Sequence, residues 1–424
     1  MVLNPNTKIC IIGLGYVGLP LAITFAKKYP TTGFDIDAKR IEDLQNFEDI
    51  TETISADQLN ALTASKQLIF TSQIELIRHC DVFIVTVPTP VTQEKLPDLL
   101  PLKDACLQLG KILQPKQIVI FESTVYPGCT EEICVPILES VSKLSYNLDF
   151  FCGYSPERIN PGDKVNTIET IVKVTSGSTP EIAHFVDELY KSVITAGTHK
   201  APSIKVAEAS KAIENAQRDV NISFINELSL IFEKMEIDTY DVIAAASTKW
   251  NFLTFKPGLV GGHCIGVDPY YLAYQAKKLG HEPQVILSGR HVNDNMGVFV
   301  AHKMAKLLHA NGKRIQNAKI LVLGMTFKEN CNDVRNSKVV DVYFELKQLG
   351  AHVDVYDPHA NPNLVKDLYN IELTNDLMQY DGIMVTVGHQ EFRELKYNQL
   401  KLDEKSVIYD LKAILPRELV NARL

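Results

Sequence analysis

Short apolar runs alternate with longer helical stretches along the first half of the chain. Runs at 8–12, 81–87 and 117–121 are apolar at nearly every position, which is typical of strands buried on both faces of a parallel sheet. The stretches between them carry apolar residues at helical spacing. The segment up to about residue 200 therefore predicts a doubly wound α/β sheet.

The pattern changes in the second half. From Ile204 to about Lys234 it is helical without proline or glycine, too long for an ordinary crossover, so we expect a spine that joins domains. The strand pattern then returns in reduced form, with apolar runs at 319–325, 351–358, 382–387 and 406–410. This predicts a second, smaller α/β unit. The expected domains are residues 1–200, 201–305 and 306–424.

The first strand leads directly into the glycine pattern Gly13-Leu14-Gly15-Tyr16-Val17-Gly18 and an apolar helix. Gly13 permits a tight turn, Gly15 lets the backbone approach a pyrophosphate, and Gly18 lets the helix pack on the strand. The helix N-terminus supplies N–H donors for phosphates. Asp35 follows about 20 residues later, where a carboxylate bonds a ribose hydroxyl. These features predict a dinucleotide-binding site of the Rossmann type.

Asp35 also favours NAD over NADP, because a carboxylate there repels a 2′-phosphate. Lys39 and Arg40 could be interpreted as a phosphate clamp, but we expect them on a solvated first helical turn, with Arg40 stacked on the adenine. The second α/β unit keeps only Gly324 at the corresponding turn. We therefore expect two Rossmann-like parallel-sheet domains joined by a long central helix, with NAD bound in the first and something else held by the second.

Composition narrows the class of protein. The 424 residues are 46% hydrophobic and 22% charged, with a net charge of −8, which gives no global attraction to nucleic acid or an anionic membrane. The eight cysteines have neither zinc-ligand spacing nor a dense disulfide pattern. No secretory signal or membrane-spanning run is recognisable. We expect a cytoplasmic enzyme with reduced thiols and no metal.

One thiol lies in an unusual context. Cys264 belongs to the run 261–271, in which glycines, a histidine and Asp268 surround it. A thiolate beside a nicotinamide can attack an aldehyde formed by one hydride transfer; the thiohemiacetal gives a second hydride, and water cleaves the thioester. An inert buried thiol is the plainer interpretation and the default for the other cysteines. Here we favour the nucleophile.

With these pieces placed, the chain resembles the UDP-sugar 6-dehydrogenase family (the UDP-glucose/UDP-mannuronate dehydrogenases) over essentially its whole length. The resemblance is carried, in the family's order, by Gly13–Pro20, Thr86-Val87-Pro88-Thr89-Pro90, Ser155-Pro156-Glu157-Arg158 and Gly261-Gly262-His263-Cys264. It implies oxidation of the sugar C6 from alcohol to carboxylate, with two NAD consumed per sugar. It also implies a homodimer formed through the spine helix, active sites between the α/β domains, and UDP-sugar binding by the C-terminal domain.

The variants at 155–162 and 263–271 resemble the branch that acts on UDP-N-acetylglucosamine or UDP-N-acetylgalactosamine. UDP-N-acetylmannosamine enzymes share much of the Cys264 motif. The UDP-glucose branch usually has Ser before the cysteine and lacks the Pro269-Tyr270-Tyr271 that this chain carries. The expected function is to supply a UDP-N-acetylhexosamine uronic acid for a surface polysaccharide. UDP-N-acetylmannosamine and UDP-glucose remain alternative substrates.

The resemblance also assigns residues. Lys211 and Asn215 share a helix face and would stabilise the oxyanion, Asp268 would handle protons with an ordered water, and Thr124 and Glu157 would position water or sugar. A solvated face is the plain alternative, since Lys205, Glu208 and Glu214 lie on the same helix. The implied cofactor-binding residues are Gly13, Gly15, Tyr16, Val17, Gly18, Asp35, Arg40, Pro88, Thr89 and Thr124. The implied substrate-binding residues are Glu157, Arg158, Lys211, Asn215, Lys256, Gly261, Arg290, Asn293, Lys328 and Arg335.

Two other classes of function remain open. A two-electron β-hydroxyacid-type dehydrogenase also joins a dinucleotide domain to a helical spine, but it needs no cysteine and forms one NADH per substrate. A non-catalytic NAD-sensing module would turn over nothing. Gly258, Gly261 and Gly262 are equally open: they could let the backbone approach a sugar or merely form a turn.

Overall fold

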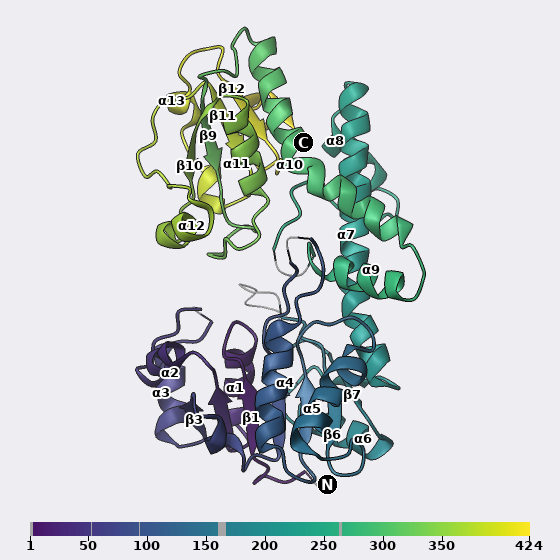
Figure 1. Cartoon of the computed structure of the whole chain (residues 1–424). Helices are drawn as coiled ribbons and strands as arrows, with labels where there is room; N and C mark the ends of the chain where they lie inside the picture. The colour runs from purple at the N-terminus through teal and green to yellow at the C-terminus, as the bar shows by residue number, and fades with distance from the viewer. Residues whose placement is uncertain (1–2, 52, 93, 160–166, 263–264) are drawn as a thin grey trace. The chain divides into compact units, whose positions relative to one another are not determined.

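The computed structural model describes residues 3–424 apart from 52, 93, 160–166 and 263–264 (Figure 1). The chain divides into two compact units. Unit 1 comprises Met1–Glu214 and Tyr270–His281, and unit 2 comprises Asn215–Pro269 and Glu282–Leu424. Among the described helices, none has both the length and the apolar character needed to cross a bilayer.

Unit 1 is built on an eight-stranded sheet with the order β3-β2-β1-β4-β5-β6-β7-β8. Its neighbours pair in parallel except β6 and β7, which are antiparallel. The strands are β1 (Ile9–Ile12), β2 (Thr31–Phe34), β3 (Leu68–Thr71), β4 (Val82–Val85), β5 (Ile118–Phe121), β6 (Phe151–Tyr154), β7 (Lys173–Gly177) and β8 (Thr198–Lys200). The helices are α1 (Gly18–Ala26), α2 (Ala38–Gln45), α3 (Ala56–Ala64), α4 (Leu100–Ile112), α5 (Val135–Ser142) and α6 (Pro180–Lys191).

The central strands of this sheet are buried at every position, which explains their uninterrupted apolar sequence. On one face, Ile9 and Ile84 share a core with Leu21 of α1 and Leu189 of α6. The strand order reverses direction between β1 and β4, and ligands of open α/β sheets bind beyond the strand ends at such a point. The doubly wound sheet predicted from the apolar runs is confirmed.

The spine predicted from residue 204 onward is the 31-residue helix α7 (Ile204–Lys234). It begins in unit 1 and ends in unit 2. The described residues between it and the second sheet also form α8 (Thr239–Ala246), α9 (Asp268–Lys278) and α10 (Gln284–Ala310). The long central helix is therefore confirmed.

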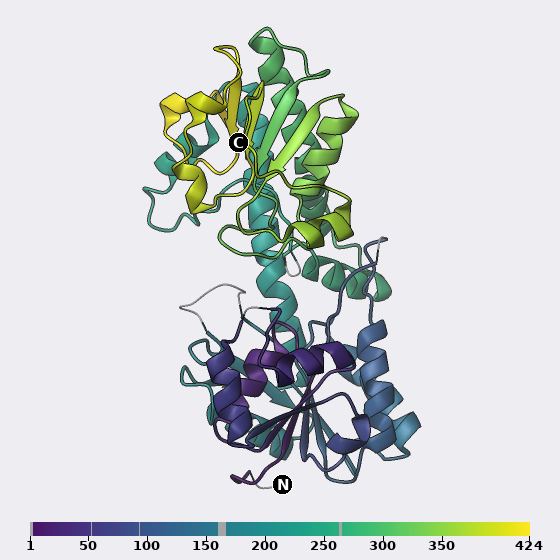
Figure 2. The same ribbon diagram turned by 90° about the vertical axis from the view of Figure 1, so that its left-hand side faces the viewer.

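Unit 2 holds a five-stranded, wholly parallel sheet with the order β10-β9-β11-β12-β13. Figure 2 shows the strands of each unit running side by side with helices around them. On one face of the unit 2 sheet, Val322 and Met384 pack with Met304 of α10 and with Val342 of the helix at 339–348. The strands are β9 (Lys319–Leu323), β10 (His352–Tyr356), β11 (Gly382–Val385), β12 (Val407–Asp410) and β13 (Ala422–Arg423), and the helices are α11 (Val339–Gln348), α12 (Pro362–Tyr369) and α13 (Tyr397–Leu400). The predicted second α/β unit is confirmed.

Candidate active site

The glycine pattern forms the turn from β1 to α1. Gly13 has φ +89°, a left-handed conformation that favours glycine, and a Cβ on Gly18 would lie 1.8 Å from the Gly13 carbonyl oxygen. A Cβ on Gly15 would meet no atom within 4 Å, so this position faces open space. Tyr16 and Val17, which complete the turn before α1, are half-buried. The turn fits a dinucleotide: two glycines shape the backbone and the third leaves room beside it.

Asp35 directly follows β2 and lies beside this turn. Its Oδ2 accepts a hydrogen bond from the Leu14 N–H at 2.7 Å, and its side chain is half-buried. A carboxylate held in this way at the end of the second strand is placed to accept ribose hydroxyls. The residues present therefore fit an adenine dinucleotide with a free 2′-hydroxyl.

Arg40 corrects one expectation. Lys39 is exposed as expected, but Arg40 is only 5% exposed instead of lying on a solvated turn. Its guanidinium donates to the Leu14 carbonyl at 2.9 Å and pairs with Asp49 at 2.8 Å. These contacts bury the guanidinium charge and attach Arg40 to the glycine turn through the Leu14 carbonyl. A cofactor contact by Arg40 stays a prediction.

The loops after β4 and β5 come together at the same edge of the sheet. Pro88 is exposed, while Thr89 and Thr124 are half-buried. The Thr89 hydroxyl donates to the Thr124 carbonyl at 2.6 Å, and the Ser123 hydroxyl donates to the Val87 carbonyl at 2.6 Å. The structure thus joins a predicted cofactor segment to a predicted catalytic residue.

The alternative of a solvated helix face, in which Glu208 counts as an ordinary charge, is wrong for this residue. The residue is 0% exposed, and its carboxylate accepts hydrogen bonds from the N–H groups of Gly128 at 2.5 Å and Thr130 at 2.9 Å. Burial raises the pKa of the carboxyl to about 7, although these donors favour its ionised form. Glu208 therefore ties α7 to the segment that follows Thr124.

Lys211 lies one helical turn beyond Glu208. Its ammonium is 3.9 Å from the carboxylate of Glu157, and both residues are buried. The alternative of a solvated helix face is therefore wrong for Lys211. The next residue, Arg158, donates to Glu214 at 3.0 Å and to the Val172 carbonyl at 2.8 Å. The motif around Glu157 is thus anchored to the first part of α7.

Asn215 and Asp268 form a second buried pair. The Asn215 amide donates to Asp268 Oδ2 at 2.5 Å, and Asp268 is the first residue of α9. Cys264, the predicted nucleophile, and His263 lie outside the described residues. Two residues predicted to assist at the oxyanion and in proton transfer are therefore in direct contact.

The segment before Cys264 is held by close backbone contacts. Asn226 of α7 accepts from the Gly258 N–H at 2.8 Å and donates to the Gly258 carbonyl at 3.0 Å. A Cβ on Gly261 would lie 2.4 Å from the Asn336 carbonyl oxygen, and one on Gly262, where φ is +83°, would lie 2.7 Å from Phe327. The glycines at 261 and 262 therefore allow this segment to pack against the loop at 325–338.

Several predicted substrate contacts have partners within the protein. Arg290 is buried and pairs with Asp219 at 2.7 Å and with Asp294 at 2.5 Å. Asn293 also donates to Asp219, at 2.7 Å. Arg335 forms a two-pronged pair with Asp333 at 3.0 and 2.9 Å, and Lys256 is exposed. Substrate contacts by these residues stay predictions.

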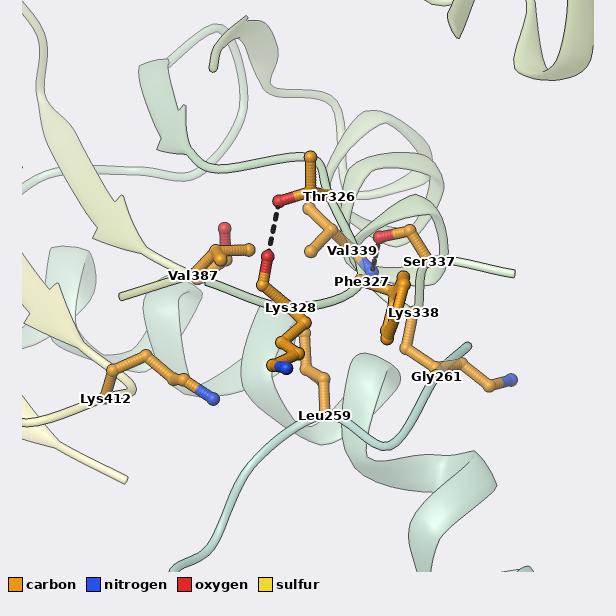
Figure 3. A pocket seen from close by; sticks show the side chains of 11 residues that line it. Leu259, Gly261, Thr326, Phe327, Lys328, Ser337, Lys338, Val339, Val387 and Lys412 are labelled. Atoms are coloured by element: carbon orange, nitrogen blue, oxygen red, sulfur yellow. Dashed lines mark hydrogen bonds between the residues drawn. The ribbon is translucent and has the colours of Figure 1, made fainter. Parts of the chain in front are cut away.

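A pocket in unit 2 opens beyond the strand ends of the second sheet. Lys328, predicted from sequence, lines it together with Lys412, which sequence reasoning missed. Figure 3 shows both lysine side chains at the pocket, and the Thr326 hydroxyl donates to the Lys328 carbonyl at 2.9 Å. Burial lowers the pKa of Lys412. Its position just after β12 was the available signal, because the loops after parallel strands carry ligand-binding residues.

Known proteins are similar to this chain in each of its three parts. Models of the UDP-glucose/GDP-mannose dehydrogenase family match the NAD binding domain over residues 7–194, the central domain over 205–295 and the UDP binding domain over 321–417. The chain is 51% identical to UDP-N-acetyl-D-glucosamine 6-dehydrogenase of Pseudomonas aeruginosa, covering 99% of this chain and 100% of the relative. It is 49% identical to the enzyme of the same name from Salmonella typhi, covering 99% of each.

A solved structure agrees with this similarity in sequence. UDP-D-ManNAc dehydrogenase of Pyrococcus horikoshii matches with a TM-score of 0.88 and 28% identity, covering 98% of each chain. The glycine turn with Asp35 is what an NAD-binding unit requires, and the lysine pocket is what a diphosphate requires. The chain belongs to the UDP-glucose/GDP-mannose dehydrogenase family, as an NAD-dependent UDP-sugar 6-dehydrogenase.

Proposed function

We propose that this enzyme oxidises C6 of UDP-N-acetylglucosamine or UDP-N-acetylgalactosamine to the uronic acid, through a thiohemiacetal and a thioester on Cys264. The identity of about half to the two enzymes named for UDP-N-acetyl-D-glucosamine supports this choice. Relatives named for UDP-N-acetyl-D-mannosamine are less similar, with up to 31% identity among those compared. UDP-N-acetylmannosamine and UDP-glucose remain alternative substrates.

The observation that carries the catalytic proposal is the buried pair of Lys211 and Glu157. A buried ammonium stabilises the oxyanion that forms when a thiolate adds to a carbonyl, because low-dielectric surroundings strengthen the attraction. Glu157 holds that ammonium and offers a carboxylate that can orient water. NAD, when bound, supplies the hydride acceptor for each of the two oxidations.

Asn215 and Asp268 complete the proposed machinery. The Asn215 amide donates to the Asp268 carboxylate, which fixes both side chains. Asp268 follows Cys264 closely in the sequence, so we assign it to move protons to and from the reacting groups with a water. Thr124, held by the hydroxyl of Thr89, would position that water.

The unit 2 pocket is the proposed site for the diphosphate of the UDP-sugar. Lys328 and Lys412 both line this pocket and bring two cationic side chains to it, the kind of group that binds a diphosphate (Figure 3). The match of residues 321–417 to the family's UDP binding domain supports the assignment. The turn at Gly324 then serves a nucleotide other than NAD.

We also propose a homodimer formed by the central segment, residues 201–305. Val206, Ile213, Phe224 and Ile231 of α7 are 46, 56, 56 and 45% exposed. Their spacing places them along one stripe of the helix, and an exposed apolar stripe of this kind marks an interface. The supply of uronic acids for a surface polysaccharide and the cytoplasmic location stay predictions.

The test is the number of NADH formed per sugar, measured with UDP-N-acetylglucosamine, UDP-N-acetylgalactosamine, UDP-N-acetylmannosamine and UDP-glucose. We expect about two NADH per sugar with the first two substrates, because four electrons leave C6. Cys264→Ala should abolish turnover, whereas Cys80→Ala, a buried thiol beside β4, should stay active. One NADH per sugar with an active Cys264→Ala would refute the thioester route and favour a two-electron dehydrogenase.

A further inference from the structure

Tyr271 has no role in the chemistry above, although it ends the motif that contains Cys264. It lies in α9, one turn after Asp268, and is 0% exposed. Its hydroxyl is 2.9 Å from the Thr89 carbonyl oxygen and 3.0 Å from the Pro90 carbonyl oxygen. A phenol buried among apolar groups needs a polar partner, and here the partners belong to the loop after β4.

Side-chain and backbone hydrogen bonds both hold this loop in shape. Pro88 and Pro90 have no N–H, so the segment cannot form a continuous backbone ladder with its neighbours. The Tyr271 hydroxyl contacts it from one side, and the Thr89 hydroxyl attaches it to Thr124 on the other. The Asp98 N–H also donates to the Pro90 carbonyl at 2.8 Å.

The position of the loop connects it to the cofactor. It follows β4, the strand beside β1 at which the strand order reverses, and the reactive part of a dinucleotide lies beyond the strand ends at such a point. A displacement of this loop would therefore change its contacts with the nicotinamide half of NAD. Tyr271 contacts no predicted sugar residue through these two bonds.

We propose that Tyr271 is a positioning residue for NAD: its hydroxyl holds the Thr89-Pro90 backbone in the conformation that receives the cofactor. The proposal rests on the assignment of Pro88 and Thr89 to NAD binding and is independent of which sugar is oxidised. The proposal gives the ring and the hydroxyl of Tyr271 different roles. The ring fills the interior of unit 1, and the hydroxyl sets cofactor affinity.

The experiment compares Tyr271→Phe with Tyr274→Phe. Both variants lose one hydroxyl from the same helix, but Tyr274 is 37% exposed and its ring packs 5.4 Å from that of Tyr126. NAD binding is measured by calorimetry without any sugar, and KM is then measured for NAD and for the UDP-sugar. We expect NAD to bind Tyr271→Phe roughly fivefold more weakly, the loss of about one hydrogen bond, with the KM of the UDP-sugar unchanged.

The control Tyr274→Phe should bind NAD as the unaltered protein does. A lower melting temperature of Tyr271→Phe with unchanged NAD affinity would overturn the proposal, because the hydroxyl would then serve the fold alone. Equal rises in both KM values would also overturn it. If Tyr271→Phe does not fold, Thr89→Val releases the same loop from its other side and should weaken NAD binding in the same direction. If the unaltered enzyme binds NAD but oxidises none of the sugars, that result counts against the proposed substrate only, because the comparison of NAD affinities needs no sugar.

Discussion

The two parallel sheets of this enzyme build the same corner and use it differently. In unit 1 the corner is Gly13, with φ +89°, and the Thr86 hydroxyl donates to its carbonyl at 2.7 Å. In unit 2 it is Gly324, with φ +104°, and the Thr386 hydroxyl donates to its carbonyl at 2.9 Å. Each threonine directly follows the strand that neighbours the corner strand. The two units therefore share the backbone conformation of this turn, although we assign them different ligands.

The acid after the second strand shows where the units diverge. Asp35 is half-buried and lies at the edge of the turn, whereas Asp357 is buried and its Oδ2 lies 3.1 Å from His389 Nε2. The Asn330 N–H donates to the other ring nitrogen of His389 at 2.9 Å. Burial by itself would raise the pKa of Asp357, but the hydrogen bonds that its carboxylate accepts from His389 and from the N–H groups of Met325 and Thr326 outweigh it and lower the pKa to about 2. In unit 2, therefore, the carboxylate of Asp357 bonds to groups of the protein itself.

The connection after the corner differs as well. In unit 1, α1 begins at Gly18, so the helix N-terminus lies directly at the turn. In unit 2, α11 begins only at Val339, and the intervening loop carries Lys328 into the pocket. The comparison teaches that one sheet corner accommodates either a helix terminus for a pyrophosphate or cationic side chains for another anion.

The largest expected effect comes from two glycine substitutions, one at Gly18 where α1 begins in unit 1 and one at the corner residue Gly324 of unit 2. Gly18→Ala should abolish NAD binding, because its Cβ would lie 1.8 Å from the Gly13 carbonyl oxygen and would push the helix off the strand. Gly324→Ala should destabilise unit 2 by roughly 2–4 kcal/mol, through strain at positive φ and overlap with Val387, while NAD still binds. Calorimetric NAD titration and thermal unfolding check both. Equal loss of NAD binding in the two variants would contradict the division of labour.

Substitution of Asp35 and of Asp357 should give effects of intermediate size, each on a different property. Asp357→Asn should lower the free energy of unfolding by roughly 2–3 kcal/mol, because a buried acceptor of several hydrogen bonds is altered, and should leave NAD affinity unchanged. Asp35→Asn should weaken NAD binding about tenfold with little change in stability. The same two measurements separate them, and a reversed result would show that Asp357 serves a nucleotide.

The smallest expected effect is a dependence on acid pH. The folded pKa of Asp357 is about 2 against an ordinary 3.8, so its contribution to stability is present above about pH 4 and is lost as pH falls toward 2. The stability difference between the unaltered enzyme and Asp357→Asn should therefore shrink by roughly 1–2 kcal/mol over that range. Unfolding curves at several acid pH values measure it. A difference that stays constant with pH would show that ionisation of Asp357 does not stabilise unit 2.

Much of the architecture could be predicted from the chain itself. The apolar runs identify strands buried on both faces, and the absence of proline and glycine from 204–234 predicts α7. The turn from Gly13 to Gly18 was predictable because positive φ and close backbone approach demand glycine. Local rules suffice here, since periodicity and backbone sterics act over neighbouring residues.

The surroundings of the charged and polar side chains needed the tertiary structure. Lys205 and Glu208 look alike in sequence, yet Lys205 is exposed and Glu208 is buried against two backbone N–H groups. Arg40, Lys412 and Tyr271 were likewise misjudged or missed, because each meets partners from distant parts of the chain or a pocket that those parts form. The sequence by itself determined the strands, the spine and the glycine turn. Only the packing of distant segments decided which polar groups are buried, because desolvation depends on everything that surrounds a group in the folded protein.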